Sequence, residues 1–321
     1  MKNLLGAFNP RVLRFGLSAL TFVALLVGTG SWNSVNVSAN HPVLVEGNCD
    51  SPVPGTTIVN PPGTCGDYDG DGRIGTAEDT DGADRIFGTL KAALGPGTGA
   101  AAGTGANNNG RITIVKSGRF AEQLLIGFTT PTFPDQGTAT PGNVTIEAAP
   151  GVAAILDAVL QGDPAGGNTA RQAGSGIVIF NNSSAASTVV VTLRNLIIRN
   201  YAEGITTAGS TRVNIDNCRI ENNRDYGVRM TDFGQIVISN SQIQGNGFRI
   251  PVSGPSNPGA GLGTMQGVQL RVINSVISNN FGPGIINSSV NNAVLYQTAV
   301  TFNNPDIVGT VTIAPNPNFT N

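Results

Sequence analysis

Apolar and polar residues alternate in short runs through the second half of the chain. In "VNIDNCRIENNRDYGV", residues 213–228, the apolar positions include Val213 and Ile215, followed by Cys218 and Ile220. Alternation over so few residues is typical of β-strands, and no apolar run here is long enough for a helix. Asn and Gly separate the runs, where left-handed backbone turns form readily. The pattern predicts three short strands in each unit.

The unit recurs about every 23 residues from residue 175 onward. One position holds Asn or Gln, at intervals of 22, 23, 34 and 23 residues: Asn195, Asn217, Asn240, Asn274 and Gln297. Six residues later a second file begins with Tyr and continues with Asn: Tyr201, Asn223, Asn246, Asn280 and Asn303. Glycines stand thirteen residues before the last four members of the first file: Gly204, Gly227, Gly261 and Gly284. The long interval is a 23-residue unit with 11 residues added before Gly261.

Three strands per unit, stacked on copies of themselves, predict a parallel solenoid that rises about 4.8 Å per coil. We expect roughly eight or nine coils. We expect both Asn files to be buried and to bond from coil to coil, because a core cannot leave amide groups unpaired. Charged residues in equivalent places on adjacent coils, Arg194 with Asp216 and Arg199 with Glu221, should form exposed ion pairs.

A leucine-rich repeat is the alternative solenoid, because its L-x-x-L-x-L-x-x-N core superposes on "IDNCRIENN" and "VINSVISNN". The second leucine position of that core holds polar or small residues instead: Cys218, Ser241, Ser275 and Thr298. The rest of each unit is rich in Gly and has no helix for a convex side. An all-β solenoid is therefore favoured.

The repeat resembles the right-handed parallel β-helix proteins, a superfamily that includes pectate lyases, pectin methylesterases and many secreted bacterial proteins. "GRITIVKSGRFAEQLLI" resembles a first coil and "NVTIEAAPGVAAIL" the next, and "ADRIFGTLKAAL", residues 83–94, resembles the short helix that caps such coils. The resemblance implies an all-β right-handed parallel β-helix over residues 83–313, followed by a tail, 314–321. It also implies a sugar cleft on the strand after each repeated Gly, beside the turn before it.

Few charged groups stand where the resemblance puts this cleft, so they define a short set of candidate ligand-binding residues. The set comprises Glu203, Asp225, Tyr226, Arg229 and, in the 11-residue insertion, Arg249. If Glu203 and Asp225 stack, they form a like-charge pair suited to a metal ion. The catalytic sequence blocks of pectate lyases and pectin methylesterases are missing. The sequence predicts binding of polysaccharide or another surface component; a carbohydrate-active lyase, esterase or hydrolase is the alternative, and a structural or adhesive role is a third.

The composition argues against several classes of partner and of catalytic site. Net charge is −2 and charged residues make up 12% of the chain, which suggests neither nucleic acid nor an anionic membrane surface as a partner. The one histidine, His41, rules out Ser-His-Asp and Cys-His catalysis and multi-histidine zinc sites. Cys218 lies inside a periodic apolar stretch, so we expect a buried structural thiol.

The pattern of residues 1–39 predicts a secretory signal peptide. Basic residues precede the apolar run 15–27, and small residues follow in "VNVSAN", which favours cleavage after Ala39, with a site near Ser31 as the alternative. The apolar run is short for a transmembrane helix, although an uncleaved anchor is the competing interpretation. We expect a secreted, extracytoplasmic protein with no membrane contact beyond this segment.

The segment 40–82 carries a calcium-loop pattern, "DYDGDGRIGTAE". The spacing matches an EF-hand loop, with Gly72 at the sharp turn, and resembles the single-helix calcium loops of dockerins. The predicted Ca²⁺ ligands are Asp67, Asp69, Asp71, Glu78 and the carbonyl of Arg73. Cys49 and Cys65 could close a disulfide nearby. We expect a structural calcium site that braces the start of the β-helix; a solvated acidic turn is the alternative.

Overall fold

Strands dominate the part of the chain that the structure describes. The computed structural model describes residues 43–45, 85–87, 90–94, 110–127, 137–139, 143–158, 174–181, 189–248, 259–291 and 293–314. The predicted signal peptide, the calcium loop, Cys49, Cys65 and Arg249 lie outside these residues. Within them, no helix is long and apolar enough to cross a membrane.

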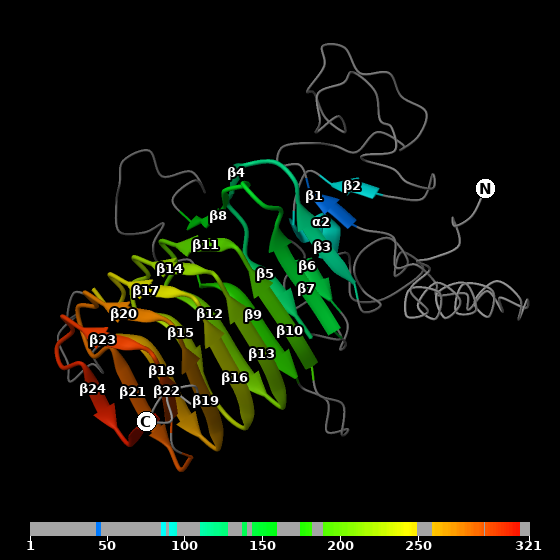
Figure 1. The fold of residues 1–321 in the computed structure, drawn as a ribbon. Coiled ribbons are helices and arrows are strands. Elements are labelled where there is room, and N and C mark those ends of the chain that lie inside the picture. The colour runs from blue at the N-terminus through cyan, green and yellow to red at the C-terminus, as the bar shows by residue number, and fades with distance from the viewer. Residues whose placement is uncertain are drawn as a thin grey trace, which may run out of the picture. The chain divides into compact units, whose positions relative to one another are not determined.

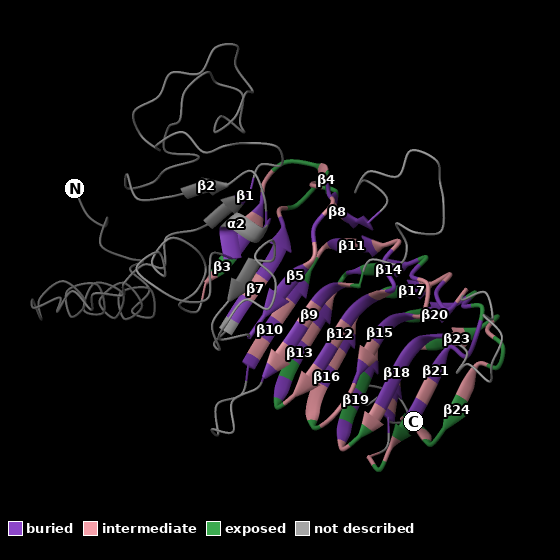
Figure 2. Cartoon of the chain, turned by 180° about the vertical axis from the view of Figure 1, so that it is seen from behind, coloured by how far each residue is buried: buried purple, intermediate pink, exposed green. Residues whose placement is uncertain are grey.

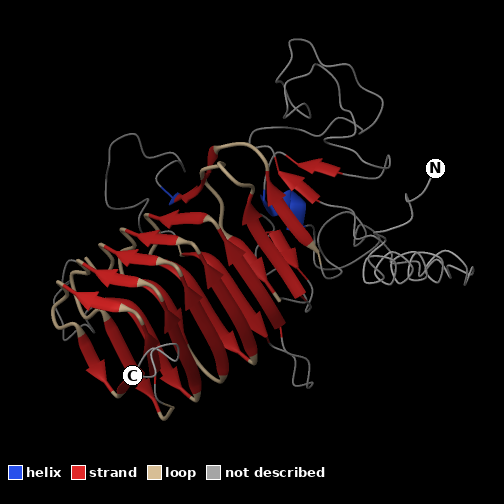
Figure 3. Cartoon of the chain, in the orientation of Figure 1, coloured by secondary structure: helices blue, strands red, loops and turns tan. Residues whose placement is uncertain are grey.

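The described strands form three parallel sheets (Figure 3). Sheet 1 has ten strands, in the order β2 (Arg85–Phe87), β1 (Val43–Val45), β3 (Arg111–Ile114), β7 (Asn143–Ala148), β10 (Val189–Arg194), β13 (Thr211–Asp216), β16 (Gly234–Ser239), β19 (Val268–Ile273), β22 (Ala293–Tyr296) and β25 (Val311–Ala314). Sheet 2 has seven, β4 (Gly118–Phe120), β8 (Ala154–Asp157), β11 (Leu196–Arg199), β14 (Arg219–Glu221), β17 (Gln242–Gln244), β20 (Val276–Ser278) and β23 (Ala299–Thr301). Sheet 3 has eight, β6 (Gly137–Ala139), β5 (Leu124–Ile126), β9 (Ser175–Asn181), β12 (Glu203–Gly209), β15 (Tyr226–Met230), β18 (Ala260–Gln266), β21 (Ile285–Ser289) and β24 (Ile307–Gly309).

From β3 onward the chain visits the three sheets in turn, apart from β6, which adds a second strand to sheet 3 after β5, and this order produces a coil (Figure 1). The predicted fold class, a right-handed parallel β-helix, is confirmed. The described strands make seven complete coils, from β3–β4–β5 to β22–β23–β24, and β25 begins another. This is fewer than the eight or nine we expected, because β1, β2 and β25 extend sheet 1 without adding a strand to sheet 2.

Isoleucines and other apolar residues stack inside the coils in register. In sheet 2, Ile198, Ile220, Ile243 and Ile277 are partners on successive strands, and each is fully buried. Buried and more exposed residues alternate along most strands, as Figure 2 shows. Burying one such side chain contributes about 1.5–3 kcal/mol, so the repeated apolar positions supply the main driving force of the fold.

The first Asn file forms single-residue turns between sheet 1 and sheet 2. All five members have left-handed backbone, with φ between 46° and 58°. The prediction that this file is buried was wrong, because Asn217, Asn240, Asn274 and Gln297 are exposed and Asn195 is half-buried. A one-residue turn points its side chain away from the core. The amides still bond along the surface, as from Asn217 Nδ2 to Asn195 Oδ1 at 2.8 Å.

The second Asn file is a buried ladder, as expected. Asn223 donates to Asn246, Asn246 to Asn280 and Asn280 to Asn303, with Nδ2–Oδ1 distances of 2.9, 3.0 and 2.8 Å. Each accepting Oδ1 also takes the backbone N–H of the residue one coil earlier, at 3.0 Å for these pairs. The ladder therefore satisfies buried backbone groups as well as its own amides.

The repeated glycines make room for this ladder. A Cβ at Gly204 would lie 2.9 Å from Asn223 Nδ2 and 2.6 Å from the carbonyl oxygen of Gly227. A Cβ at Gly227 would lie 2.9 Å from Asn246 Nδ2. Because real side chains do not tolerate such contacts, the Gly file and the Asn file form one packing unit.

A short helix, α2 (Leu90–Leu94), packs at the start of the β-helix against β1, β2, β3 and β6. Leu90, Ala93 and Leu94 are fully buried, and the Leu90 N–H donates to Glu122 Oε1 at 3.0 Å. The predicted cap helix over residues 83–94 is thus correct only for its second half. Residues 85–87 form β2 instead, since Ile and Phe favour strands and the following Gly disfavours a helix.

Candidate functional site

Three of the predicted ligand residues meet on the outer face of sheet 3. Glu203 begins β12, Tyr226 begins β15 on the next coil, and Arg229 lies three residues further along β15. The strand register pairs Glu203 with Tyr226 and Thr206 with Arg229. The side chains therefore come from two adjacent coils.

An ion pair joins Glu203 and Arg229. Arg229 Nη1 lies 2.7 Å from Glu203 Oε1, and the two side chains are 36% and 13% exposed. This hydrogen bond is the main cause of a raised pKa at Arg229. The other carboxylate oxygen, Oε2, accepts from Thr206 Oγ1 and from Ser175 Oγ, the latter at 3.2 Å. Both oxygens of Glu203 are therefore occupied by protein donors.

Tyr226 supports the Arg229 guanidinium. The guanidinium carbon lies 5.5 Å from the Tyr226 ring centroid, in the range of a cation–π contact. The ring needs the glycine of the next coil, because a Cβ at Gly263 would lie 2.7 Å from Tyr226 Cε1. Arg229 Nε is buried and has no hydrogen-bond partner among the described residues. Glu203 and Tyr226 thus hold Arg229 in place, and the Nε–H of Arg229 can still donate a hydrogen bond.

Asp225 acts on Arg229 only as a nearby charge, which contributes least to the raised pKa of Arg229. Its carboxylate pairs with Arg224, at 2.7 Å between Oδ2 and Nη2. Glu203 and Asp225 do not stack as the like-charge pair that the sequence left open, because Tyr226 is the register partner of Glu203. In the described part of the chain, no three His, Cys, Asp or Glu residues group as a metal site.

Two phenylalanines that the sequence analysis did not single out lie in the turns from sheet 2 to sheet 3. The rings of Phe248 and Phe281 meet edge to face, with centroids 6.0 Å apart. Phe281 is 66% exposed. Phe248 and Phe281 lie on the two coils after that of Tyr226 and beside the predicted cleft. The sequence signal was the aromatic residue directly after Asn280 in "NNFGPG".

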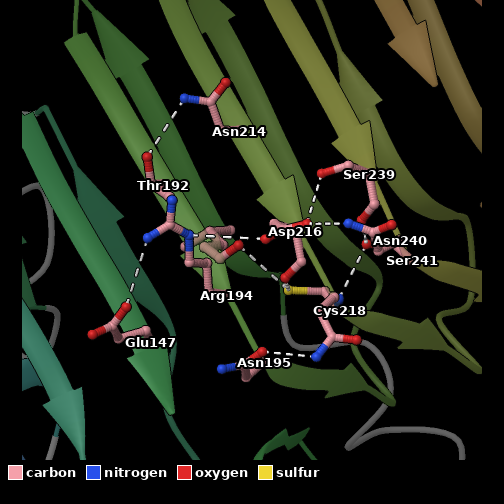
Figure 4. Close-up of polar contacts among 12 residues, drawn as sticks. Glu147, Thr192, Arg194, Asn195, Asn214, Asp216, Cys218, Ser239, Asn240 and Ser241 are labelled. Atoms are coloured by element: carbon pink, nitrogen blue, oxygen red, sulfur yellow. Dashed lines mark hydrogen bonds and ion pairs between the residues drawn. The ribbon is translucent and has the colours of Figure 1, made fainter. Parts of the chain in front are cut away.

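A row of alternating charges crosses sheet 1 (Figure 4). Arg194 lies between two carboxylates, 3.9 Å from Glu147 and 4.0 Å from Asp216. Asp216 in turn accepts from Ser239 at 2.7 Å and from Asn240 at 2.8 Å. The predicted stacking of Arg194 on Asp216 is confirmed by the strand register. The row compensates charge between adjacent coils.

A second row, on sheet 2, is more deeply buried than predicted. Arg199 Nε lies 2.8 Å from Asp157 Oδ2, and its Nη1 lies 3.8 Å from Glu221 Oε1. The strand register confirms that Arg199 stacks on Glu221. The expectation that this pair is exposed was wrong, because Asp157 and Glu221 are 1% and 3% exposed. Buried carboxylates without such a partner would be costly, and this row is structural.

Cys218 is a buried free thiol, as predicted. The residue is 3% exposed, and Sγ lies 3.4 Å from the carbonyl oxygen of Asp216. Burial raises the pKa of the Cys218 thiol to about 12. A thiol that stays protonated is a poor nucleophile, so Cys218 belongs to the core.

Comparison with known proteins agrees with the observed architecture. Residues 175–319 match the family profile described as right handed beta helix region. The described strands therefore form a right-handed parallel β-helix, and this profile matches its C-terminal part. The crystal structure of pectate lyase Pel9A is similar in part, with a TM-score of 0.31 and 14% identity over 64% of this chain and 68% of that chain. No curated protein matches the chain. The β-helix repeat establishes the fold and assigns no activity.

Proposed function

We propose that this β-helix protein binds polysaccharide through the outer face of sheet 3 and the turns that precede its strands. The observation that carries the proposal is the fixed Arg229 beside Tyr226, with the guanidinium held by Glu203 at 2.7 Å. A preorganised arginine loses little freedom on binding and donates to hydroxyl or carboxylate oxygens.

The aromatic residues nearby supply the second kind of contact that a sugar needs. The exposed Phe281 and its partner Phe248 provide apolar surface on which the C–H faces of sugar rings can pack. Sheet 3 therefore offers polar donors and an aromatic edge on neighbouring coils.

The same geometry favours binding over catalysis by these residues. A lyase base must give up its proton readily, whereas the hydrogen bond to Glu203 raises the pKa of Arg229. The Glu203 carboxylate is occupied on both oxygens, and the Asp225 carboxylate is paired with Arg224. The alternative, a carbohydrate-active enzyme that uses these groups, would require the ion pair to open.

The test combines binding and turnover. We expect the full chain to bind fragments of polygalacturonate, alginate or chitin without cleaving them, and Arg229→Ala to abolish binding. Arg271→Ala is the matched control, because Arg271 is exposed on sheet 1 away from this face. Turnover that disappears in Arg229→Ala would establish an enzyme instead. Absence of both binding and turnover would leave a structural or adhesive role.

Two further parts of the proposal rest on the sequence alone. Residues 1–39 would direct secretion, and the loop from Asp67 to Glu78 would hold a structural Ca²⁺. Both fit a protein that meets polysaccharide outside the cytoplasm.

A further inference from the structure

We infer that the end of the β-helix formed by β23, β24 and β25 is an interface for a second copy of this chain, in an end-to-end dimer. These are the last strands of the three sheets, and β23 and β24 lie at the red end of the coil in Figure 1. Among the described residues, each pairs along one edge alone, with β20, β21 and β22 respectively. The end is separate from the outer face of sheet 3, so the inference does not rest on the proposed function.

Apolar residues in core positions lie uncovered at this end. Val300 is the register partner of the fully buried Ile277, and Ile313 is the partner of the buried Leu295. Ile313 is nevertheless 75% exposed, and Val300 is half-buried. Both side chains continue the stack of the core but lack the next layer, so they lose much of the free energy that burial contributes. A layer of apolar residues placed on this end would recover that contribution.

The repeat does not supply this layer by making a further coil. Ala314 is the register partner of Tyr296, so Pro315 stands where Gln297 makes the one-residue turn from sheet 1 into sheet 2. Gln297 has a φ of 47°, whereas a proline ring fixes φ at about −65°. The chain therefore cannot turn into sheet 2 here in the way of the earlier coils, which favours cover by another chain.

The low charge of this end favours a copy of itself as the partner. In residues 299–314 Asp306 is the one charged residue, and its carboxylate accepts a hydrogen bond from Asn303. Edge strands that avoid pairing with another chain usually carry charged residues or Pro, and β23, β24 and β25 carry neither. Two such ends can therefore meet without repulsion between like charges.

The symmetry of the dimer follows from the other end of the β-helix. There, Leu90 and Leu94 of α2 are buried in the core, so a head-to-tail array of copies is disfavoured. Two open ends pair instead about a two-fold axis, which sets β25 antiparallel to the same strand of the copy. The end offers sixteen residues, 299–314, fewer than the roughly 20–30 per side of a standard interface. We therefore expect a reversible dimer whose population rises with concentration.

The test is sedimentation equilibrium of the full chain from about 1 µM to about 1 mM, beside solution X-ray scattering. We expect a monomer–dimer equilibrium and a dimer longer than the monomer. Ile313→Lys should raise the dissociation constant by about tenfold or more, because it places a charge in the apolar contact of both copies. Thr312→Lys is the matched control. Its register partner, Val294, lies on the outer face of sheet 1, so the constant should change by less than about twofold.

The outcomes decide between this end and other surfaces. A dimer that Ile313→Lys weakens and Thr312→Lys does not supports the inference. Equal weakening by the two variants would place the contact on the outer face of sheet 1 and overturn it. A monomer at every concentration, or a dimer that both variants leave unchanged, would also overturn it. If Ile313→Lys loses its native circular dichroism, Ile313→Gln takes its place, with an expected rise of about threefold in the dissociation constant.

Discussion

Asn223 donates a hydrogen bond of 2.9 Å to Asn246, one coil further along, and both side chains are fully buried. The same Asn246 oxygen accepts the Asn223 backbone N–H at 3.0 Å. The ladder begins at Tyr201, whose N–H donates to Asn223, and it ends at Asp306, which accepts from Asn303. A 23-residue repeat can thus turn sharply inside its own core without leaving amides unpaired.

Removal of one amide from this ladder should destabilise the β-helix. Asn246→Ala leaves the buried N–H of Asn223 without its acceptor and removes one of the two acceptors of Asn223 Nδ2, which keeps the Ile198 carbonyl at 3.4 Å. Each lost acceptor costs roughly 1–3 kcal/mol, so we expect the free energy of unfolding to fall by about 3 kcal/mol. Urea denaturation measures it. The control Asn274→Gly keeps the left-handed turn and removes an exposed amide, and it should cost less than about 1 kcal/mol. Equal losses would contradict the distinction between the two files.

The buried charge row on sheet 2 gives a second stability prediction. Arg199→Met removes the arginine that pairs with the buried Asp157, whereas Glu221 keeps Arg219 at 2.5 Å. Breaking a buried pair costs roughly 3–5 kcal/mol, and we expect the lower end because Asn200 still donates to Asp157 at 2.7 Å. Arg271→Met, at an exposed arginine, is the control in the same denaturation series. A loss below about 1 kcal/mol at Arg199 would show that this row contributes little.

The raised pKa of the Cys218 thiol predicts how the stability of the protein changes at alkaline pH. Its pKa is about 12 in the folded protein and close to 9.0 when exposed, so the contribution is complete below pH 9.0. Between these values the unfolded chain loses the proton and the folded chain keeps it, and stability falls by up to about 1.4 kcal/mol per pH unit. Thermal melts from pH 8 to pH 11 should therefore decline more steeply for wild type than for Cys218→Ala. Parallel declines would contradict this, as would rapid labelling of the native thiol at pH 8.

The proposed calcium loop predicts sensitivity to chelation. EGTA should lower the melting temperature of the mature protein, because a metal bound to the folded state stabilises it by mass action. A double variant, Asp67→Ala with Asp71→Ala, should melt at that lower temperature with or without EGTA. If chelation leaves the wild-type melt unchanged, the loop is an acidic turn and holds no structural calcium.

Repetition made the coil predictable from sequence. Ile198, Ile220 and Ile243 recur at the same place, and the period of the repeat gives the strand register. The exposure of the side chains in the first Asn file was not predictable in the same way. A left-handed residue such as Asn217 signals a turn, but its exposure depends on the length of that turn. The predicted number of coils was too high because β1 and β2 pair with sheet 1 but lie outside the repeat.

The candidate site was predictable only where it follows the repeat. Glu203, Tyr226 and Arg229 lie on strands whose outer positions could be enumerated, although a one-residue shift in register separates Asp225 from them. Phe248 and Phe281 were missed because they lie in turns, and turn lengths differ between coils.

The most direct test of the account is the binding of oligogalacturonide to the full chain, measured by calorimetry beside an assay for cleavage of the same ligand. We predict saturable binding, no cleavage, and loss of binding in Arg229→Ala but not in Arg271→Ala. Cleavage that depends on Arg229, or no binding of this ligand or of alginate and chitin fragments, would contradict the proposal that the outer face of this β-helix is a polysaccharide-binding surface.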